Sequence, residues 1–358
     1  MITETLRSME KRMSWTNGRK MLALAGISPS VGWQRTIEKY SGDDKALPVG
    51  ELQDALTEHN LCGDKFTKLY RFNEDARDRL YAFFTQCEVT ESKATEAFPN
   101  TVSDDELDEL GSDFEIVNVT SNEDGIGMVL SSVFTYTKRE SIEFSVFDEP
   151  SEMRNKYEEV VGLKNVRTQL LHVIWLPHHR DYLEIRVDYP KGMKEVEAHG
   201  FHSILKRKVN DWGIVALERP INLFPAVRAL YDDEDEGTVT EITFATPTSA
   251  IKNEKMLRRN RQYLDQRKEV YHLAGKKGLG DDAEIIVYKV TVEWPRPEEG
   301  IDYVPSVALS ASGPSGNGPG NMPTISGASI ANCIRAADYE FVIERLGEKA
   351  KLEELAGH

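Results

Sequence analysis

Cysteine is scarce in this chain. Its three cysteines, Cys62, Cys87 and Cys333, are widely spaced and odd in number. Such a set does not form the disulfide framework of a small secreted domain, and it favours a reducing compartment. A chain of 358 residues can bury enough surface to fold without disulfide or metal staples. We therefore expect an intracellular, cytoplasmic protein.

Long apolar runs are also missing. No stretch approaches the ~20 residues that a membrane-spanning helix needs. The first fifteen residues lack the apolar centre of a secretory signal and have the pattern of an amphipathic helix. The sequence therefore predicts no membrane partner.

The common catalytic motifs are absent as well. The segment Gly26–Gly32 has the glycine spacing of a phosphate-binding loop, but Trp33 follows where that loop needs lysine. No Gly-x-Ser-x-Gly, Cys-x-x-Cys or His-Glu-x-x-His is present. His199 and His202 could share one helical face, but a zinc site would need further ligands. We expect no cofactor, no metal and no assigned catalytic residue.

Charge is present in excess but is unevenly distributed. The net charge is −16, and residues 89–160 carry 5 Lys/Arg against 18 Asp/Glu. The densest part, residues 103–109, follows Pro99 and suits an acidic interdomain linker. A second interpretation makes this stretch a mimic of phosphate that covers a basic surface elsewhere in the chain.

Hydrophobic periodicity predicts an α+β fold, with a helical N-terminal module followed by a larger mixed or antiparallel-sheet domain and a C-terminal helix. The expected parts are a small all-helical module (1–88), an acidic linker (89–112), an α+β domain (113–308), a flexible Gly/Ser/Pro-rich loop (309–327), and a C-terminal helical segment (328–358) that packs on the α+β domain.

Two segments of the α+β domain carry specific expectations. Residues 170–176 and 183–187 predict a hairpin around the turn 177–180, which would place His172 opposite Ile185 on an apolar face. His172 is expected to be a core histidine with satisfied hydrogen bonds. Residues 250–274 have the spacing of one long helix.

Basic side chains gather in two segments, 206–208 and 252–277. The second contains nine Lys/Arg against three Asp/Glu. Such clusters attract phosphate, although a solvated helix face would look the same. We therefore expect a non-enzymatic binding, regulatory or accessory subunit that acts on nucleic acid or on a nucleic-acid-processing complex. The candidate contacts are Lys206, Arg207, Lys208, Lys252, Lys255, Arg258, Arg259, Arg261, Lys268, Lys276 and Lys277.

Two alternatives stay open. One is a metal-dependent hydrolase or nuclease that uses Asp181, Glu184 and Asp188, although Arg186 stands where such enzymes carry lysine. The other is a protein–protein scaffold. Asn260 and Arg267 fall within the apolar face of the expected 250–274 helix, and they would contact a partner subunit there. A buried Arg267 would otherwise need a carboxylate or carbonyl partner within the chain.

Overall fold

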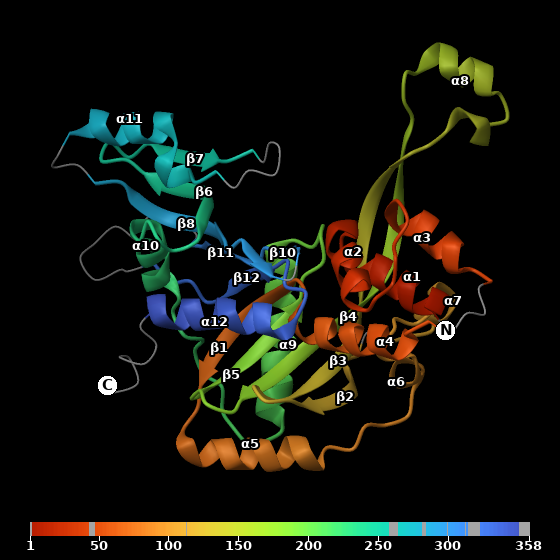
Figure 1. Cartoon of the computed structure of the whole chain (residues 1–358), viewed down its shortest axis with the longest axis horizontal. Coiled ribbons are helices and arrows are strands. Elements are labelled where there is room, and N and C mark those ends of the chain that lie inside the picture. The colour runs from red at the N-terminus through yellow and green to blue at the C-terminus, as the bar shows by residue number, and fades with distance from the viewer. Residues whose placement is uncertain are drawn as a thin grey trace.

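A computed structural model describes residues 2–42, 47–111, 113–257, 264–280, 284–298, 300–311, 313 and 323–350. Within these ranges the chain forms helices around one ten-stranded sheet, in which every strand pair is antiparallel. The expected α+β class, with a helical N-terminal part and a C-terminal helix, is confirmed (Figure 1). None of the helices in these ranges is long and apolar enough to cross a membrane.

The α-helices are α1 (Ile2–Arg12), α2 (Trp15–Leu24), α3 (Gly32–Tyr40), α4 (Val49–Cys62), α5 (Glu74–Gln86), α6 (Lys93–Ala97), α7 (Asp104–Leu107), α8 (Pro150–Lys156), α9 (Glu195–Asp211), α10 (Phe224–Asp232), α11 (Val270–Leu279) and α12 (Ala336–Ala350). Two 3₁₀ turns are η1 (Phe144–Val146) and η2 (Gln266–Lys268).

The large sheet has the strand order β2-β3-β4-β5-β1-β12-β11-β8-β6-β7. Its strands are β1 (Lys65–Arg71), β2 (Glu115–Ser121), β3 (Gly125–Ser141), β4 (Val161–Pro177), β5 (Tyr182–Asp188), β6 (Thr238–Ala245), β7 (Ile251–Lys255), β8 (Ile286–Glu293), β11 (Ser306–Ser310) and β12 (Ala328–Ala331). A separate hairpin joins β9 (Arg296–Glu298) to β10 (Ile301–Tyr303).

Strand β1 lies inside the sheet, between β5 and β12. The expectation that residues 1–88 are helical throughout is therefore wrong for 65–71. Phe66 and Tyr70 project toward α9 and α5, while Leu69 projects to the opposite face, toward α10 and α12. Pairing on both edges and burial on both faces override the weak helical pattern of a segment that contains two lysines.

The remaining corrections concern connections. Residues 250–274 are not one helix: β7 extends the sheet by pairing with β6, and α11 begins only at Val270. The acidic stretch 89–112 forms α6 and α7 and packs on the fold, where the Val102 amide donates to Gln169 Oε1 at 2.9 Å. Most of the expected loop 309–327 lies outside the described residues, as does the chain after Ala350.

The β4–β5 hairpin forms, but its register differs from the expected one by two residues. Ile174, rather than His172, lies opposite Ile185. A shift of two keeps each side chain on its expected face, so His172 is a core residue with satisfied hydrogen bonds, as predicted. Its Nε2 lies 2.8 Å from Ser132 Oγ, and its Nδ1 accepts from the Asp188 amide at 3.1 Å. Burial lowers the pKa of His172 to about 3.

Asp188 at the end of β5 is the centre of a buried ionic network. Its carboxylate accepts from both terminal nitrogens of Arg12 in α1, at 3.0 and 3.2 Å. It also accepts from Lys65 Nζ in β1 at 2.9 Å and from the Leu171 amide in β4 at 3.0 Å. Burial alone would raise the pKa of Asp188, but Arg12 and Lys65 hold it well below its usual range.

Replacing Asp188 by asparagine keeps the shape but leaves two buried cations without their counter-charge. We expect Asp188→Asn to lower the free energy of unfolding by about 3–5 kcal/mol, measured by urea denaturation. Asp181→Asn is the control, because Asp181 pairs with Arg71 at an exposed position and its loss should cost under about 1 kcal/mol. Equal effects of the two substitutions would contradict the central role of Asp188.

Candidate functional site

One face of helix α9 consists of ionisable side chains. Glu195, His199, His202 and Lys206 are spaced by four, three and four residues, which places them on one side of a helix. This side faces β1: the His199 ring centroid lies 4.8 Å from that of Phe66, and the His202 ring stacks on Tyr70 at 5.7 Å. Lys206 Nζ lies 5.6 Å from the centroid of the Tyr70 ring.

Lys68 lies between Phe66 and Tyr70 on the face of β1 that α9 covers. Only 8% of the residue is exposed. Its Nζ is 5.8 Å from the centroid of the Phe66 ring, and among the described residues it has no hydrogen-bond acceptor and no ion pair. Lys65, three residues earlier and on the opposite face, has both Asp188 and the Leu171 carbonyl. Lys68 therefore differs from Lys65, whose side chain is fully buried and paired with Asp188.

A cavity of about 320 Å³ is lined by Phe66, two residues before Lys68 on the same face of β1, and its volume is in the range of ligand-binding clefts. Phe66 forms part of its wall, and Glu195 and His199 reach it from α9. The other lining residues are small or hydroxyl-bearing: Ser310, Ala311, Thr324, Ile325, Ser326 and Gly327. Glycine is required at 327, because a Cβ atom there would lie 2.6 Å from Phe66 Cζ.

The electrostatics of this cluster are dominated by burial and by neighbouring positive charge. Burial lowers the pKa of Lys68, and Lys206 lowers it further, while Glu195 opposes the shift. The pKa values of His199 and His202 are lowered by burial first and by Lys68 second. His202 Nε2 is buried without a hydrogen-bond partner. Both histidines therefore favour the neutral form near pH 7.

Glu195 is the acidic residue in the cavity wall. Its Oε1 lies 3.6 Å from His199 Nε2, so its charge is directed at the histidine. Lys68 and Lys206 outnumber Glu195, whose charge acts on Lys68 as well as on His199. We name this arrangement the α9–β1 cleft: the 320 Å³ cavity together with Lys68, Glu195 and His199.

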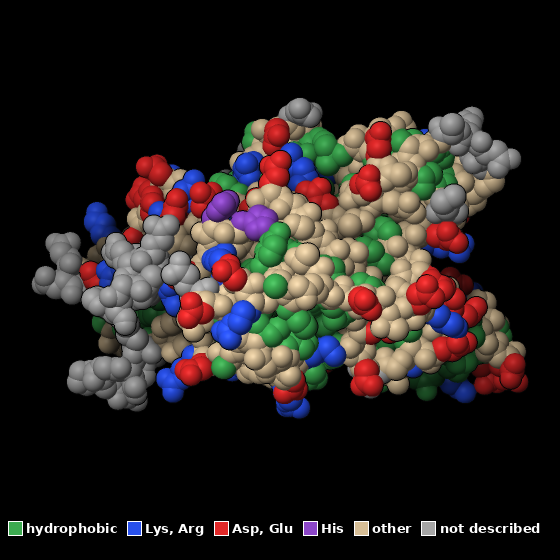
Figure 2. All heavy atoms as spheres, turned by 90° about the horizontal axis from the view of Figure 1, so that it is seen from below, with side chains coloured by type: hydrophobic (Ala, Val, Ile, Leu, Met, Phe, Trp, Pro, Cys, Tyr) green, Lys and Arg blue, Asp and Glu red, His purple; other side chains and the backbone are tan. Residues whose placement is uncertain are grey.

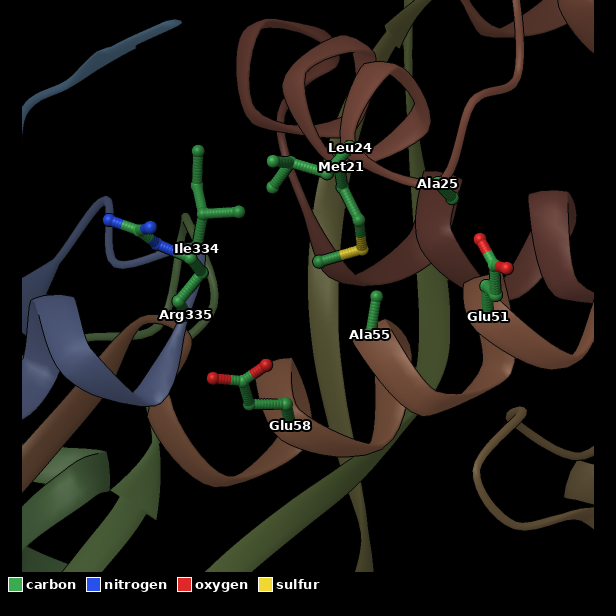
Figure 3. A pocket seen from close by; sticks show the side chains of 8 residues that line it. All are labelled: Met21, Leu24, Ala25, Glu51, Ala55, Glu58, Ile334 and Arg335. Atoms are coloured by element: carbon green, nitrogen blue, oxygen red, sulfur yellow. The ribbon is translucent and has the colours of Figure 1, made fainter. Parts of the chain in front are cut away.

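A second cavity, of about 160 Å³, lies between α2, α4 and the turn before α12 (Figure 3). Two of its polar side chains, Glu58 and Arg335, have partners within the chain. Glu58 accepts from the Ala336 amide at 2.7 Å, and Arg335 pairs with Glu298 at 2.9 Å and with Asp338 at 3.3 Å. Its other lining is mainly apolar, and we assign it no ligand.

The two basic segments predicted from the sequence do not converge. Residues 206–208 belong to α9, which packs on β5, whereas 252–255 belong to edge strand β7. The strands β1, β12, β11, β8 and β6 separate β5 from β7. The face seen in Figure 2 shows Lys and Arg dispersed among Asp and Glu. Arg258, Arg259, Asn260 and Arg261 lie outside the described residues.

Several of the predicted contact residues have partners within the chain. Lys206 donates to the Glu218 carbonyl and Lys208 to the Phe114 carbonyl, the latter at 3.2 Å. Lys255 pairs with Glu241 at 2.9 Å, and Lys276 Nζ donates to the Tyr231 hydroxyl at 3.1 Å. Among the predicted contact residues that the structure describes, Arg207, Lys252, Lys268 and Lys277 are exposed and have no ion pair or side-chain hydrogen bond to another described residue.

Arg267 was expected to meet a partner subunit, and the structure corrects this. Its guanidinium is buried and pairs with Asp265 at 2.6 Å. It also donates to the carbonyls of Gly237 at 2.8 Å and of Leu230 and Glu236 at 3.3 Å. These bonds tie the end of α10 to the start of β6, and they satisfy the charge within the chain.

The carboxylates of the metal-hydrolase alternative are likewise occupied. Glu184 lies in a fully buried strand and pairs with Arg186 at 2.9 Å, and Asp188 is held by Arg12 and Lys65. Asp181 pairs with Arg71 at the surface. The half-exposed strand face assumed for this site is absent, because helices cover both faces of β5. Across the described ranges, no group of three His, Cys, Asp or Glu side chains could hold a metal ion.

The α9–β1 cleft was only partly visible in the sequence. The shared helical face of His199 and His202 was recognised, but Lys68 was not, because its segment was assigned to helices. The alternation of Phe66, Lys68 and Tyr70 was the available signal. No known protein family, no characterised protein and no solved structure matches this chain.

The two buried lysines of β1 should respond in opposite ways to substitution by methionine, which keeps length and removes charge. Lys68→Met removes an unpartnered cation, so we expect the free energy of unfolding to rise by about 1 kcal/mol. Lys65→Met leaves Asp188 with one cation fewer and should lower the free energy of unfolding by about 3 kcal/mol. Urea denaturation measures both. A loss at Lys68 as large as that at Lys65 would show that Lys68 has a structural partner.

Proposed function

We propose that this protein is a non-enzymatic binding protein whose α9–β1 cleft takes the phosphate group of a phosphate-bearing ligand, nucleotides and nucleic acid among them. The observation that carries the proposal is Lys68, a mostly buried lysine with no ion pair among the described residues, on the same face of β1 as Phe66, which lines a cavity of ligand size. A lysine of this kind lowers the stability of the free protein, and a bound anion would offset part of that cost.

The other groups of the cleft support the same chemistry. Ser310, Thr324 and Ser326 bring hydroxyl donors to the cavity wall, and a phosphate oxygen accepts hydrogen bonds from such groups. His199 can be protonated and would then add a second positive charge. Glu195 limits the affinity for anions, which favours ligands that bring further contacts over free phosphate.

The phosphate group is the part of a nucleic acid that the α9–β1 cleft would bind. On the same helix, Lys206 extends the basic row of the cleft, and Arg207 is exposed one residue later. A nucleotide or the end of a nucleic-acid strand could place one phosphate near Lys68 and reach these residues with the next. The basic residues of 252–277 lie at the far edge of the sheet and do not contribute to this site.

Isothermal titration calorimetry at low salt tests the proposal with inorganic phosphate, a mononucleotide and a single-stranded oligonucleotide. Lys68→Met should weaken binding about ten- to a hundredfold, the effect of losing one charge-assisted hydrogen bond. The exposed Lys252→Met is the control and should change little. Binding of phosphate alone would identify a small-anion site, and tighter binding of the longer ligands would identify the nucleic-acid class. Unchanged binding in Lys68→Met would reject the cleft.

The pH dependence can be measured with sulfate, because its charge stays constant between about pH 5 and pH 8. His199 is faced by Glu195, Lys68 and His202, and its pKa lies below the usual value of about 6.5. Protonation of His199 as the pH falls toward its pKa adds positive charge, so sulfate should bind more tightly at lower pH. His199→Gln should flatten this dependence, and Glu195→Gln should strengthen binding at neutral pH. A pH-independent affinity in the wild type would contradict the role of His199.

A further inference from the structure

The outer half of the β3–β4 ribbon projects from the body of the fold and carries α8 at its tip (Figure 1). We name residues 137–165 the arm. None of its residues is buried. An isolated two-stranded ribbon is marginally stable in water, because it has no apolar face to cover. Contact with a second protein surface would therefore stabilise the arm.

The exposed chemistry of the arm combines apolar and acidic side chains. Val146, Tyr157, Val161 and Leu163 are large hydrophobic residues that are exposed to solvent. Acidic residues outnumber basic ones, seven to five, and all twelve are exposed; the acidic ones are Glu140, Glu143, Asp148, Glu149, Glu152, Glu158 and Glu159. A surface that would receive the arm should therefore be apolar with a basic rim.

Helix α11 presents such a surface. His272 anchors the helix through Glu254, at 2.7 Å, and through the Tyr231 hydroxyl, also at 2.7 Å. The outward side is apolar: Val270 is 79% exposed, Tyr271 76% and Leu273 49%. Exposed Lys268 and Lys277 flank it and have no ion pair among the described residues. We name these five residues the α11 surface. Clustered exposed apolar groups of this kind mark interaction sites.

The two features cannot meet within one molecule. Figure 1 shows α8 at the upper right and α11 at the upper left of the molecule, at opposite sides of the fold. The arm can therefore meet the α11 surface only when the two belong to different molecules of this protein. A contact of this type is heterologous, because each copy uses two different surfaces, and it generates a ring or an open chain.

We propose that the arm of one copy docks on the α11 surface of a second copy. Tyr157 and Leu163 would cover Val270, Tyr271 and Leu273, and the acidic residues of the arm would lie against Lys268 and Lys277. The proposal is independent of the ligand of the α9–β1 cleft, which lies on a different part of the chain.

A charge exchange tests the direction of this contact. One variant, Glu158→Lys with Glu159→Lys, makes the arm more basic. The other, Lys268→Glu with Lys277→Glu, makes the α11 surface acidic. Each variant alone places like charges at the contact and should be monomeric, while an equal mixture restores both complementary contacts and should associate. Sedimentation velocity of the full chain over a range of concentrations at low salt measures all three samples and the wild type.

A separate pair of substitutions tests the apolar part of the contact. Tyr271→Ser or Leu163→Ser should each shift the association of the wild type to about tenfold higher concentration or beyond, the effect of losing one well-packed hydrophobic anchor. Val31→Ser is the control, because Val31 is 75% exposed and belongs to neither surface. A wild type that stays monomeric at every concentration, or a mixture of charge variants that does not associate, would overturn the proposal.

Discussion

The buried carboxylate of Asp188 is the interaction on which the fold depends. It joins the N-terminal helices, through Arg12, to the interior strands β1, β4 and β5, through Lys65 and the Leu171 amide. Each of these groups would be costly to bury alone, so their arrangement requires that α1 and the three strands assemble together. The network explains how a helical segment at the start of the chain and a hairpin near its middle form one structure, although more than a hundred residues separate them.

Strand β1 illustrates how one element can serve both stability and binding. Successive side chains of a strand point to opposite faces, so Lys65 reaches the Asp188 network while Lys68 reaches α9. The first lysine is satisfied within the chain, and the second has no ion pair among the described residues. The fold can hold the unfavourable Lys68 because strong pairing on both edges of β1 fixes the backbone. A ligand would then return part of the free energy that the buried charge costs.

Sequence patterns predicted the fold class and the β4 and β5 strands, where apolar residues dominate or alternate. They failed for β1 and β7, because Lys65, Lys68, Lys252 and Lys255 hide the strand pattern, and only pairing with neighbouring strands decides the conformation. The spacing of His199 and His202 correctly indicated one helical face. The cleft itself could not be predicted, since it depends on Phe66 and Lys68 of a strand that lies more than a hundred residues away in the chain.

The structure shows where the acidic residues of the unevenly charged sequence lie. Some of the acidic residues of 89–160 lie on α6 and α7, and others lie on the projecting arm. At physiological salt, screening limits the reach of exposed charges to roughly 8 Å, so the arm cannot attract a partner from far away. Exposed ion pairs contribute under about 1 kcal/mol each, so the cohesion of any contact must come from apolar residues such as Tyr157 and Tyr271. The charges then select which surfaces meet, and Lys268 and Lys277 give α11 a basic rim in a chain of net charge −16.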